Sequence, residues 1–288
     1  MGQRQFALDH PGENYTLEKA KQPENRDYHA LSLDGVSCTV CHQIADPTNQ
    51  PIQQIRTGDF SLTKRTAQGL LSLVGPFPNP AVGPMAQSLG TIPQHQEYVK
   101  DSKLCASCHT VYLPVLDTGG KVLDHKYEQA TYLEWDNSSY RDGSPLVKSC
   151  QDCHMPDSFN GPLGPQKIAN VQDQDFPETD NQADVQVPKR DGYRRHQLLG
   201  INAYALEMFR HFPDILGVRL TSFMTGFDNG LPKAIESAAQ TASENSARVE
   251  ILQTQLAGNQ LTVQVKSTNL AGHRFPSGVG FRRLFMQM

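Results

Sequence analysis

The sequence predicts a chain that is mainly α-helix and loop, with few strands before residue 246 and a small β-sandwich-like segment after it. Apolar side chains make up 38% of the 288 residues and the mean hydropathy is −0.51, which is lean beside the roughly 45–50% usual in globular chains. Helical periodicity is confined to residues 196–245, and strict alternation begins only beyond them. We therefore expect four regions: 1–160, a polar connector over 161–195, a helical region over 196–245, and an incomplete strand segment over 246–288.

Residues 1–160 are expected to be loop-rich, with short helices around three cysteine motifs. Residues 75–80 (GPFPNP) open a passage dense in proline and glycine that extends to residue 93. Because proline lacks an amide donor and fixes φ, this run cannot form a helix or a central strand. We expect it to wrap over a surface, and we expect the polar, proline-containing residues 161–195 to be an exposed connector.

Two helices are predicted in the third region. Residues 196–212 place Leu199, Ala203, Leu206 and Phe209 at spacings of three and four, which is typical of an amphipathic helix. A second helix is expected to have Pro232 in its first turn and to run toward residue 245.

The last region is predicted to form a hairpin. Leu261, Val263 and Val265 alternate with polar residues, as do Val249 and Ile251 before the turn sequence of residues 257–260 (AGNQ). This period of two indicates a hairpin with one buried face.

All six cysteines belong to pentads of the form C-x-x-C-H. This spacing is the attachment signature of c-type haem, in which two thiols bond to the porphyrin and the adjacent histidine binds the iron. We therefore expect three covalently bound haem c groups. The predicted attachment residues are Cys38, Cys41, Cys105, Cys108, Cys150 and Cys153. The predicted iron ligands are His42, His109 and His154.

Other cysteine chemistries explain the pattern less well. Paired C-x-x-C units of a zinc ribbon usually lie about 15–20 residues apart, whereas Cys41 and Cys105 are much farther apart and three pairs leave one without a mate. Three disulfides would account for the even number of cysteines but not for the histidine after each pair. A thioredoxin-like role requires a surrounding βαβ pattern, which we do not find around the pentads.

The second axial ligand decides what each haem does. A second histidine or methionine makes a six-coordinate electron carrier, whereas an open position makes a site for substrate or gas. Methionine ligation is possible through Met85, Met208 or Met224, but the surplus of histidines favours histidine. Among the ten histidines, the candidates for opposite ligands are His196, at the start of a predicted helix, and His273, in a Gly- and Pro-bounded loop. His95 and His29, which precede the second and first pentads, are further candidates.

Charge and termini limit the partners and the location. The net charge of −4 and the pI near 6.2 argue against a nucleic-acid partner, and no apolar run is long enough to cross a bilayer. Residues 1–6 (MGQRQF) contain no secretory leader. Since haem c is attached outside the cytoplasm, we expect a mature or trimmed chain, or a segment of a longer one, that works in the periplasm or outside a bacterial or archaeal cell.

Several stretches resemble a known superfamily. Residues 34–37 (DGVS), 131–135 (TYLEW) and 150–156 (CQDCHMP) are similar to multihaem c-type cytochromes related to hydroxylamine oxidoreductase and pentahaem nitrite reductase. Residues 272–278 (GHRFPSG), with Arg282 and Arg283 behind them, resemble a β-rich module often attached to such cytochromes. The resemblance implies a multihaem core with a partial C-terminal β module, in which His196 binds the iron of a haem attached elsewhere in the sequence.

Departures from that superfamily favour electron transfer over catalysis. The nitrite reductases carry a catalytic pentad that ends in Lys, which is missing here, and the hydroxylamine-oxidising relatives carry more than three haems. We expect a trihaem carrier with bis-His haems, or such a part of a larger or polymeric cytochrome, whose partners are other redox proteins or copies of itself. The alternative is an oxidoreductase with one five-coordinate haem that acts on a small nitrogen or sulfur compound, with Tyr132, Arg141 or Lys148 in its pocket.

Overall fold

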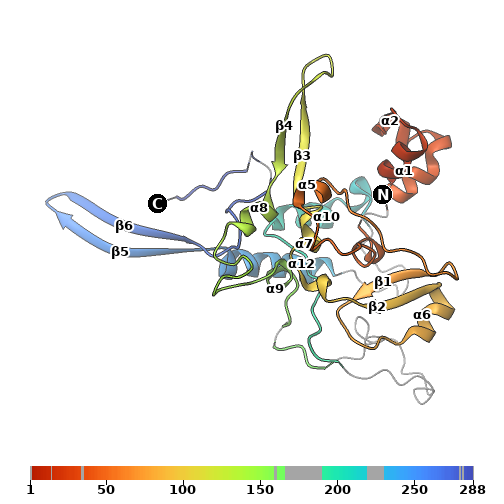
Figure 1. The fold of residues 1–288 in the computed structure, drawn as a ribbon. Helices are drawn as coiled ribbons and strands as arrows, with labels where there is room; N and C mark the ends of the chain where they lie inside the picture. The colour runs from red at the N-terminus through yellow and green to blue at the C-terminus, as the bar shows by residue number, and fades with distance from the viewer. Residues whose placement is uncertain are drawn as a thin grey trace. The chain divides into compact units, whose positions relative to one another are not determined.

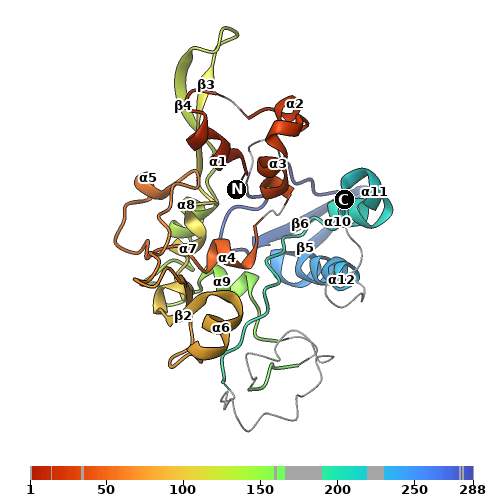
Figure 2. The same ribbon diagram turned by 90° about the vertical axis from the view of Figure 1, so that its right-hand side faces the viewer.

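The computed structural model describes residues 2–13, 15–33, 36–158, 161–165, 190–218, 230–278, 280 and 282–287. Figures 1 and 2 draw its helices and strands in two views. The chain divides into two compact units. The first unit comprises Met1–Pro47 and Phe60–Val99, and the second comprises Thr48–Asp59 and Lys100–Met288. The first pentad therefore belongs to the first unit, and the second and third pentads belong to the second unit. The four-region division expected from the sequence stays a prediction.

The first unit begins with short helices, drawn in red in Figure 1. These are α1 (Gly2–Asp9), α2 (Leu17–Ala20), η1 (Pro23–Asn25) and α3 (Arg26–Leu33). Helix α1 packs on α3, and the buried ring of Phe6 contacts the rings of His10, Tyr15 and Tyr28. Aromatic rings contribute much apolar area each, so this cluster holds helices that are too short to be stable alone.

A small βαβ arrangement completes the first unit. Strand β1 (Leu71–Gly75) pairs in parallel with β2 (Thr91–His95), and α6 (Val82–Leu89) lies between them in sequence. Gly90 ends α6 with a left-handed φ of 62°, which glycine adopts without steric cost. The run of residues 75–80 leads from β1 into a loop, as its prolines require. The helix that follows it was not expected from the sequence.

In the second unit, strands β3 (Val111–Leu116) and β4 (Val122–Gln129) form an antiparallel hairpin. The carboxylate of Asp117 accepts hydrogen bonds from the amides of Gly119 and Lys121, and Gly120 has a φ of 84°. An Asx turn closed by glycine is a strong local signal for a reversal of the chain. The hairpin thus arises from its turn chemistry and from the β-branched and aromatic residues on either side.

Short helices carry the rest of the second unit. They are α5 (Ile52–Ile55), α7 (Lys103–Ala106), α8 (Thr131–Asp136), α9 (Cys150–His154), α10 (Ala203–His211), α11 (Pro213–Leu216), α12 (Leu231–Thr241) and η4 (Ala242–Ser246), while η2 (Glu97–Lys100) leads into the unit from the first. Helix α12 has Pro232 in its first turn, as expected. The other expected helix is shorter than predicted: α10 begins after its N-cap Asn202, and residues 196–202 are irregular. Leu198 has a φ of 49°, which a helix does not accommodate.

Strands β5 (Ala247–Ala257) and β6 (Gln260–Asn269) form the expected C-terminal hairpin, drawn in blue in Figure 1. Gly258 takes a φ of 62° in the turn. The expected burial of one face is not observed in the described chain, because Val249, Ile251 and Leu261 are all exposed.

The fold class predicted from the sequence is wrong. Helices account for 34% and strands for 21% of the described chain, and its sheets all have two strands. Four of the strands precede residue 246, and the C-terminal segment is a single hairpin rather than a sandwich. The prediction failed because residues 1–160 were expected to be loop-rich, and the strand signals of β1 and of the β3–β4 hairpin within them were not recognised.

Within the described ranges, each helix is too short or too polar to cross a bilayer.

Candidate functional site

The first pentad folds as a one-turn helix, α4 (Cys38–Cys41). Val40 is 8% exposed and anchors the turn in the core, while Cys38 is exposed and Cys41 is half-buried. The amide of His42 donates to the carbonyl of Cys38 at 3.1 Å, so the turn continues into the histidine. Residues three apart lie on one side of a helix, and the two thiols are thus presented to the same partner.

Strand β1 fixes the orientation of His42. Its Nδ1 lies 2.5 Å from the carbonyl oxygen of Val74, and the amide of Val74 donates to the carbonyl of His42 at 2.7 Å. A carbonyl accepts but cannot donate, so Nδ1 carries the proton and Nε2 is the basic nitrogen. Iron-binding histidines use this arrangement, in which a hydrogen bond at one ring nitrogen fixes the other on the metal.

The second pentad begins on α7. Ala106 is fully buried beneath the turn, whereas Cys105 is half-buried and Cys108 is exposed. The amide of His109 donates to the carbonyl of Cys105 at 3.0 Å, which repeats the backbone contact of the first pentad.

The side-chain amide of Gln129, the last residue of β4, lies 3.2 Å from Nδ1 of His109. The amide oxygen and nitrogen of glutamine exchange places by a 180° rotation. In the structure the amide nitrogen of Gln129 faces Nδ1 of His109 and also lies 3.4 Å from the hydroxyl of Thr131. After that rotation the amide oxygen would accept from Nδ1, and Nε2 of His109 would be left to bind a metal.

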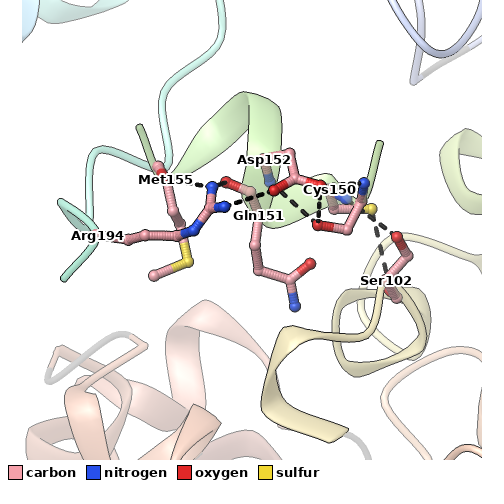
Figure 3. Close-up of polar contacts among 7 residues, drawn as sticks. Ser102, Cys150, Gln151, Asp152, Met155 and Arg194 are labelled. Carbon is pink, nitrogen blue, oxygen red and sulfur yellow. Dashed lines mark hydrogen bonds and ion pairs between the residues drawn. The ribbon is translucent and has the colours of Figure 1, made fainter. Parts of the chain in front are cut away.

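Helix α9 holds the third pentad and is capped at both ends. Ser149 and Asp152 form a capping box, in which the serine hydroxyl accepts from the amide of Asp152 and the aspartate accepts from the amide of Ser149. Figure 3 shows the guanidinium of Arg194 at the other side of the turn, where it pairs with Asp152 at 2.6 Å and donates to the carbonyls of Gln151 and Met155. Arg194 therefore belongs to this site rather than to a solvated loop.

Ser102 joins the second and third pentads. Its carbonyl accepts from the amide of Cys105 at 3.0 Å. Its hydroxyl accepts from the amide of Cys150, also at 3.0 Å, and Figure 3 shows these two residues side by side. The thiol of Cys150 lies 4.0 Å from the same carbonyl, and a hydrogen bond with Cys105 lowers the pKa of the Cys150 thiol. Ser102 therefore brings the second and third pentads close together, so groups attached to them would be neighbours.

His154 is held in the same way as His42. Its Nδ1 lies 3.1 Å from the carbonyl oxygen of Leu199, and the carbonyl of His154 accepts from the amide of Leu198 at 2.8 Å. Burial lowers the pKa of His154, which favours the neutral ring that binds metals.

His273 faces His154. Their ring centroids are 6.3 Å apart and their planes are inclined by 14°. The Nδ1 of His273 lies 2.9 Å from the carbonyl oxygen of Arg274, so this ring also keeps Nε2 as its basic nitrogen. A metal–imidazole bond is about 2.0–2.1 Å long, so two rings bound to one metal through Nε2 have centroids roughly 6 Å apart. The observed centroid separation is close to that length.

Two further candidate ligands lie in the first unit with the first pentad. His95 ends β2 opposite Gly75, the residue after Val74, and its Nε2 contacts Glu97 at 2.9 Å. His29 is half-buried on α3. Neither is brought to a pentad histidine by a described ring contact.

The remaining histidines are placed as follows. His196 lies exposed in the irregular segment that precedes Leu199. The same segment holds His154 through the backbone carbonyl of Leu199. His10 contacts Phe6, His125 stacks on Tyr112, and His211 lies near Glu207 at the end of α10.

Three residues were considered for a substrate pocket near the third pentad. Burial, followed by nearby carboxylates, raises the pKa of Tyr132 to about 12, so its hydroxyl stays protonated. Lys148 lies over the ring of Tyr140 at 5.5 Å from its centroid, and Arg141 is exposed.

Comparisons of the chain with protein-family models, with curated proteins and with solved structures gave no match. The resemblance to multihaem cytochromes therefore stays an expectation drawn from motifs.

The residues around the pentads fit a covalently held haem. In the described part of the chain no disulfide joins any of the six cysteines. Apolar side chains flank the third pentad yet are open to solvent, with Leu198 59% exposed and Val147 52% exposed, and a large apolar plate would cover such surface. No cluster of three or more His, Cys, Asp and Glu side chains able to hold a bare ion occurs in the described residues. A porphyrin needs no such cluster, because its own nitrogens supply most of the ligands.

No local pattern identifies the groups that orient the pentad histidines. Val74 and Leu199 act through backbone carbonyls, which every residue type has, so only the fold can identify them. Ser102 and Gln129 are polar residues close to the second pentad, but nothing in their sequence spacing indicated a contact with Cys150 or with His109.

Proposed function

We propose that the chain is a trihaem c-type cytochrome that passes electrons between redox partners through His-ligated haems. The observation that carries this proposal is the facing pair of His154 and His273, whose centroid separation of 6.3 Å matches two imidazoles on one iron. A six-coordinate iron has no position for substrate, which favours electron transfer over catalysis.

Bound haem supplies the reversible one-electron change of its iron, and the chain supplies the rest. The thiols fix each porphyrin by two bonds, and the carbonyls of Val74 and Leu199 fix the rings of His42 and His154. Because these rings are already oriented, little rearrangement accompanies a change of charge on the iron, which suits a rapid carrier.

Electrons would pass most easily between the second and third haems. Ser102 contacts both pentads, through its carbonyl and its hydroxyl. The haems that these two pentads would hold are therefore proposed to be near neighbours. We propose that the first haem is held in the first unit, by the first pentad.

The proposal keeps the resemblance to the multihaem superfamily and the location outside the cytoplasm. Its partners are other redox proteins or further copies of the chain. The rival function is an oxidoreductase with one five-coordinate haem. It differs in the spin state of that haem, which spectroscopy detects.

The test is electron paramagnetic resonance of the oxidised protein combined with carbon monoxide binding to the reduced form. Low-spin signals from all three haems and no uptake of carbon monoxide are expected. A high-spin signal from about one third of the iron, with one carbon monoxide bound per chain, would instead support the oxidoreductase.

A further inference from the structure

We propose that Glu134 is the positioning residue that keeps His273 on the iron of the third haem. This inference rests on the proposed function, because it concerns the axial ligand pair His154 and His273. It assigns a role to a carboxylate in helix α8 that touches neither the iron nor the thiols.

Glu134 holds the backbone on the C-terminal side of His273. Its Oε2 accepts a hydrogen bond from the amide of Arg274 at 3.2 Å and another from the hydroxyl of Ser277 at 2.7 Å. The amide of Arg274 belongs to the same peptide unit as the carbonyl of His273, so the carboxylate fixes the plane from which the imidazole extends. Hydrogen bonds to an ionised carboxylate are about twice as strong as those between neutral groups.

Close packing holds the backbone on the N-terminal side of His273. A Cβ atom on Gly272 would lie 3.2 Å from Cδ2 of Tyr140 and 3.3 Å from Cδ1 of Trp135, so the loop lies directly against these rings. Trp135 is 4% exposed and next to Glu134 on α8. The same helix therefore fixes the loop on both sides of the histidine.

Helix α8 is also bound to the pentads. The indole of Trp135 donates to the carbonyl of Lys148 at 2.8 Å, just before the third pentad, and the amide of Tyr132 donates to the carbonyl of His109 at 3.3 Å. Glu134 thus lies on an element whose position is set by the pentads. The two hydrogen bonds of Glu134 connect the His273 loop to α8. The distance from His273 to His154 is therefore set by α8 rather than by the loop alone.

A purely structural role predicts less than this. If Glu134 only stabilised the fold, its replacement would lower the unfolding midpoint and leave the spin state of the iron in the folded protein unchanged. A positioning role predicts that the folded protein, with three haems attached, loses the axial bond from His273. The two roles are separated by the spin state of the iron.

The experiment compares the wild type with Glu134→Ala, Glu134→Gln, His273→Ala and the matched control Glu128→Ala. Glu128 is an exposed carboxylate on β4. Each purified variant is first weighed intact to count its haems, and is then examined by paramagnetic resonance and by carbon monoxide titration of the reduced form. The signals of the first and second haems report whether each variant is folded.

We expect His273→Ala and Glu134→Ala to bind one carbon monoxide per chain, against none for the wild type and Glu128→Ala. Added imidazole should occupy the open position in both variants and restore the low-spin signal. Glu134→Gln keeps an acceptor oxygen and should show a smaller high-spin fraction. The double variant Glu134→Ala with His273→Ala should bind as much carbon monoxide as His273→Ala alone, because both changes remove the bond between His273 and the iron.

If Glu134→Ala keeps three low-spin haems and binds no carbon monoxide while His273→Ala binds one, the inference is wrong and the proposed function stands. If His273→Ala itself keeps three low-spin haems, the pairing with His154 is wrong and the inference falls with it. A wild type without haem overturns both. If Glu134→Ala does not accumulate, the variant Ser277→Ala takes its place, because it removes one of the two hydrogen bonds to Glu134. It must show a high-spin fraction and carbon monoxide binding, each smaller than in His273→Ala. A Ser277→Ala protein with three low-spin haems and no bound carbon monoxide would equally contradict the inference.

Discussion

The hydroxyl of Ser102 accepts a hydrogen bond from the backbone amide of Cys150 at 3.0 Å, across 48 residues of sequence. Ser102 is 2% exposed, and its carbonyl also accepts from the amide of Cys105. One buried serine thereby sets the start of the third pentad against the second. This contact is the reason to expect two closely spaced haems in the second unit.

Replacing Ser102 by Ala is expected to leave the amide of Cys150 without an acceptor. An unsatisfied buried donor costs about 1–3 kcal/mol, so the free energy of unfolding should fall by that amount in a urea titration. The matched control is Ser61→Ala, an exposed serine of the first unit, which should change stability by less than about 0.5 kcal/mol. Equal stability of Ser102→Ala and wild type would contradict the contact.

Replacing Arg194 by Ala is expected to destabilise the protein at neutral pH by about 1 kcal/mol, since the ion pair with Asp152 is partly exposed. Burial raises the pKa of Asp152, but hydrogen bonds from Ser149 and the charge of Arg194 outweigh it, so this pKa lies below the ordinary value of 3.8. The stability that this lowered pKa contributes is present above pH 4 or so and is lost as the pH falls through the folded value.

The difference between the wild type and Arg194→Ala should therefore shrink in acid. Urea titrations at about pH 6 and about pH 3 measure it, with Arg248→Ala, an exposed arginine on β5, as the control. A difference that grew toward low pH would show that the ion pair does not lower the pKa of Asp152.

Replacing Gly272 by Ala is expected to push the His273 loop away from α8. The new Cβ would lie 3.2 Å from Tyr140 and 3.3 Å from Trp135, and overpacking of this kind costs about 1–3 kcal/mol. Gly280→Ala is the control, because a Cβ there meets nothing within 4 Å. Thermal unfolding followed by circular dichroism should show a lower midpoint for Gly272→Ala alone, and similar midpoints for the two variants would argue against the close packing.

Local signals in the sequence predicted those elements that depend on few residues. Pro232 marks the first turn of α12 because its missing amide donor is harmless there. The alternation around residues 257–260 predicts the β5–β6 hairpin, because a two-residue turn needs a residue such as Gly258 with positive φ. Each pentad is short enough to be recognised without its neighbours.

Elements that depend on distant residues were missed. Nothing near Leu198 indicated its positive φ, and the segment before α10 is irregular because its backbone bonds to His154 instead of to itself. The β3–β4 hairpin could have been predicted from Asp117 and Gly120, whose turn chemistry was not recognised in a region expected to be loop-rich. Of the candidate opposite ligands, only the fold distinguishes His273, since its partner His154 is far away in sequence.

The most direct test is the intact mass of the chain after export in a host that attaches haem c, together with its absorbance after reduction with dithionite. The polypeptide mass plus three haems, with a sharp red-region band, is the expected result. A mass equal to that of the amino acids alone, or a reduced spectrum without that band, would contradict the assignment of haem to the three pentads.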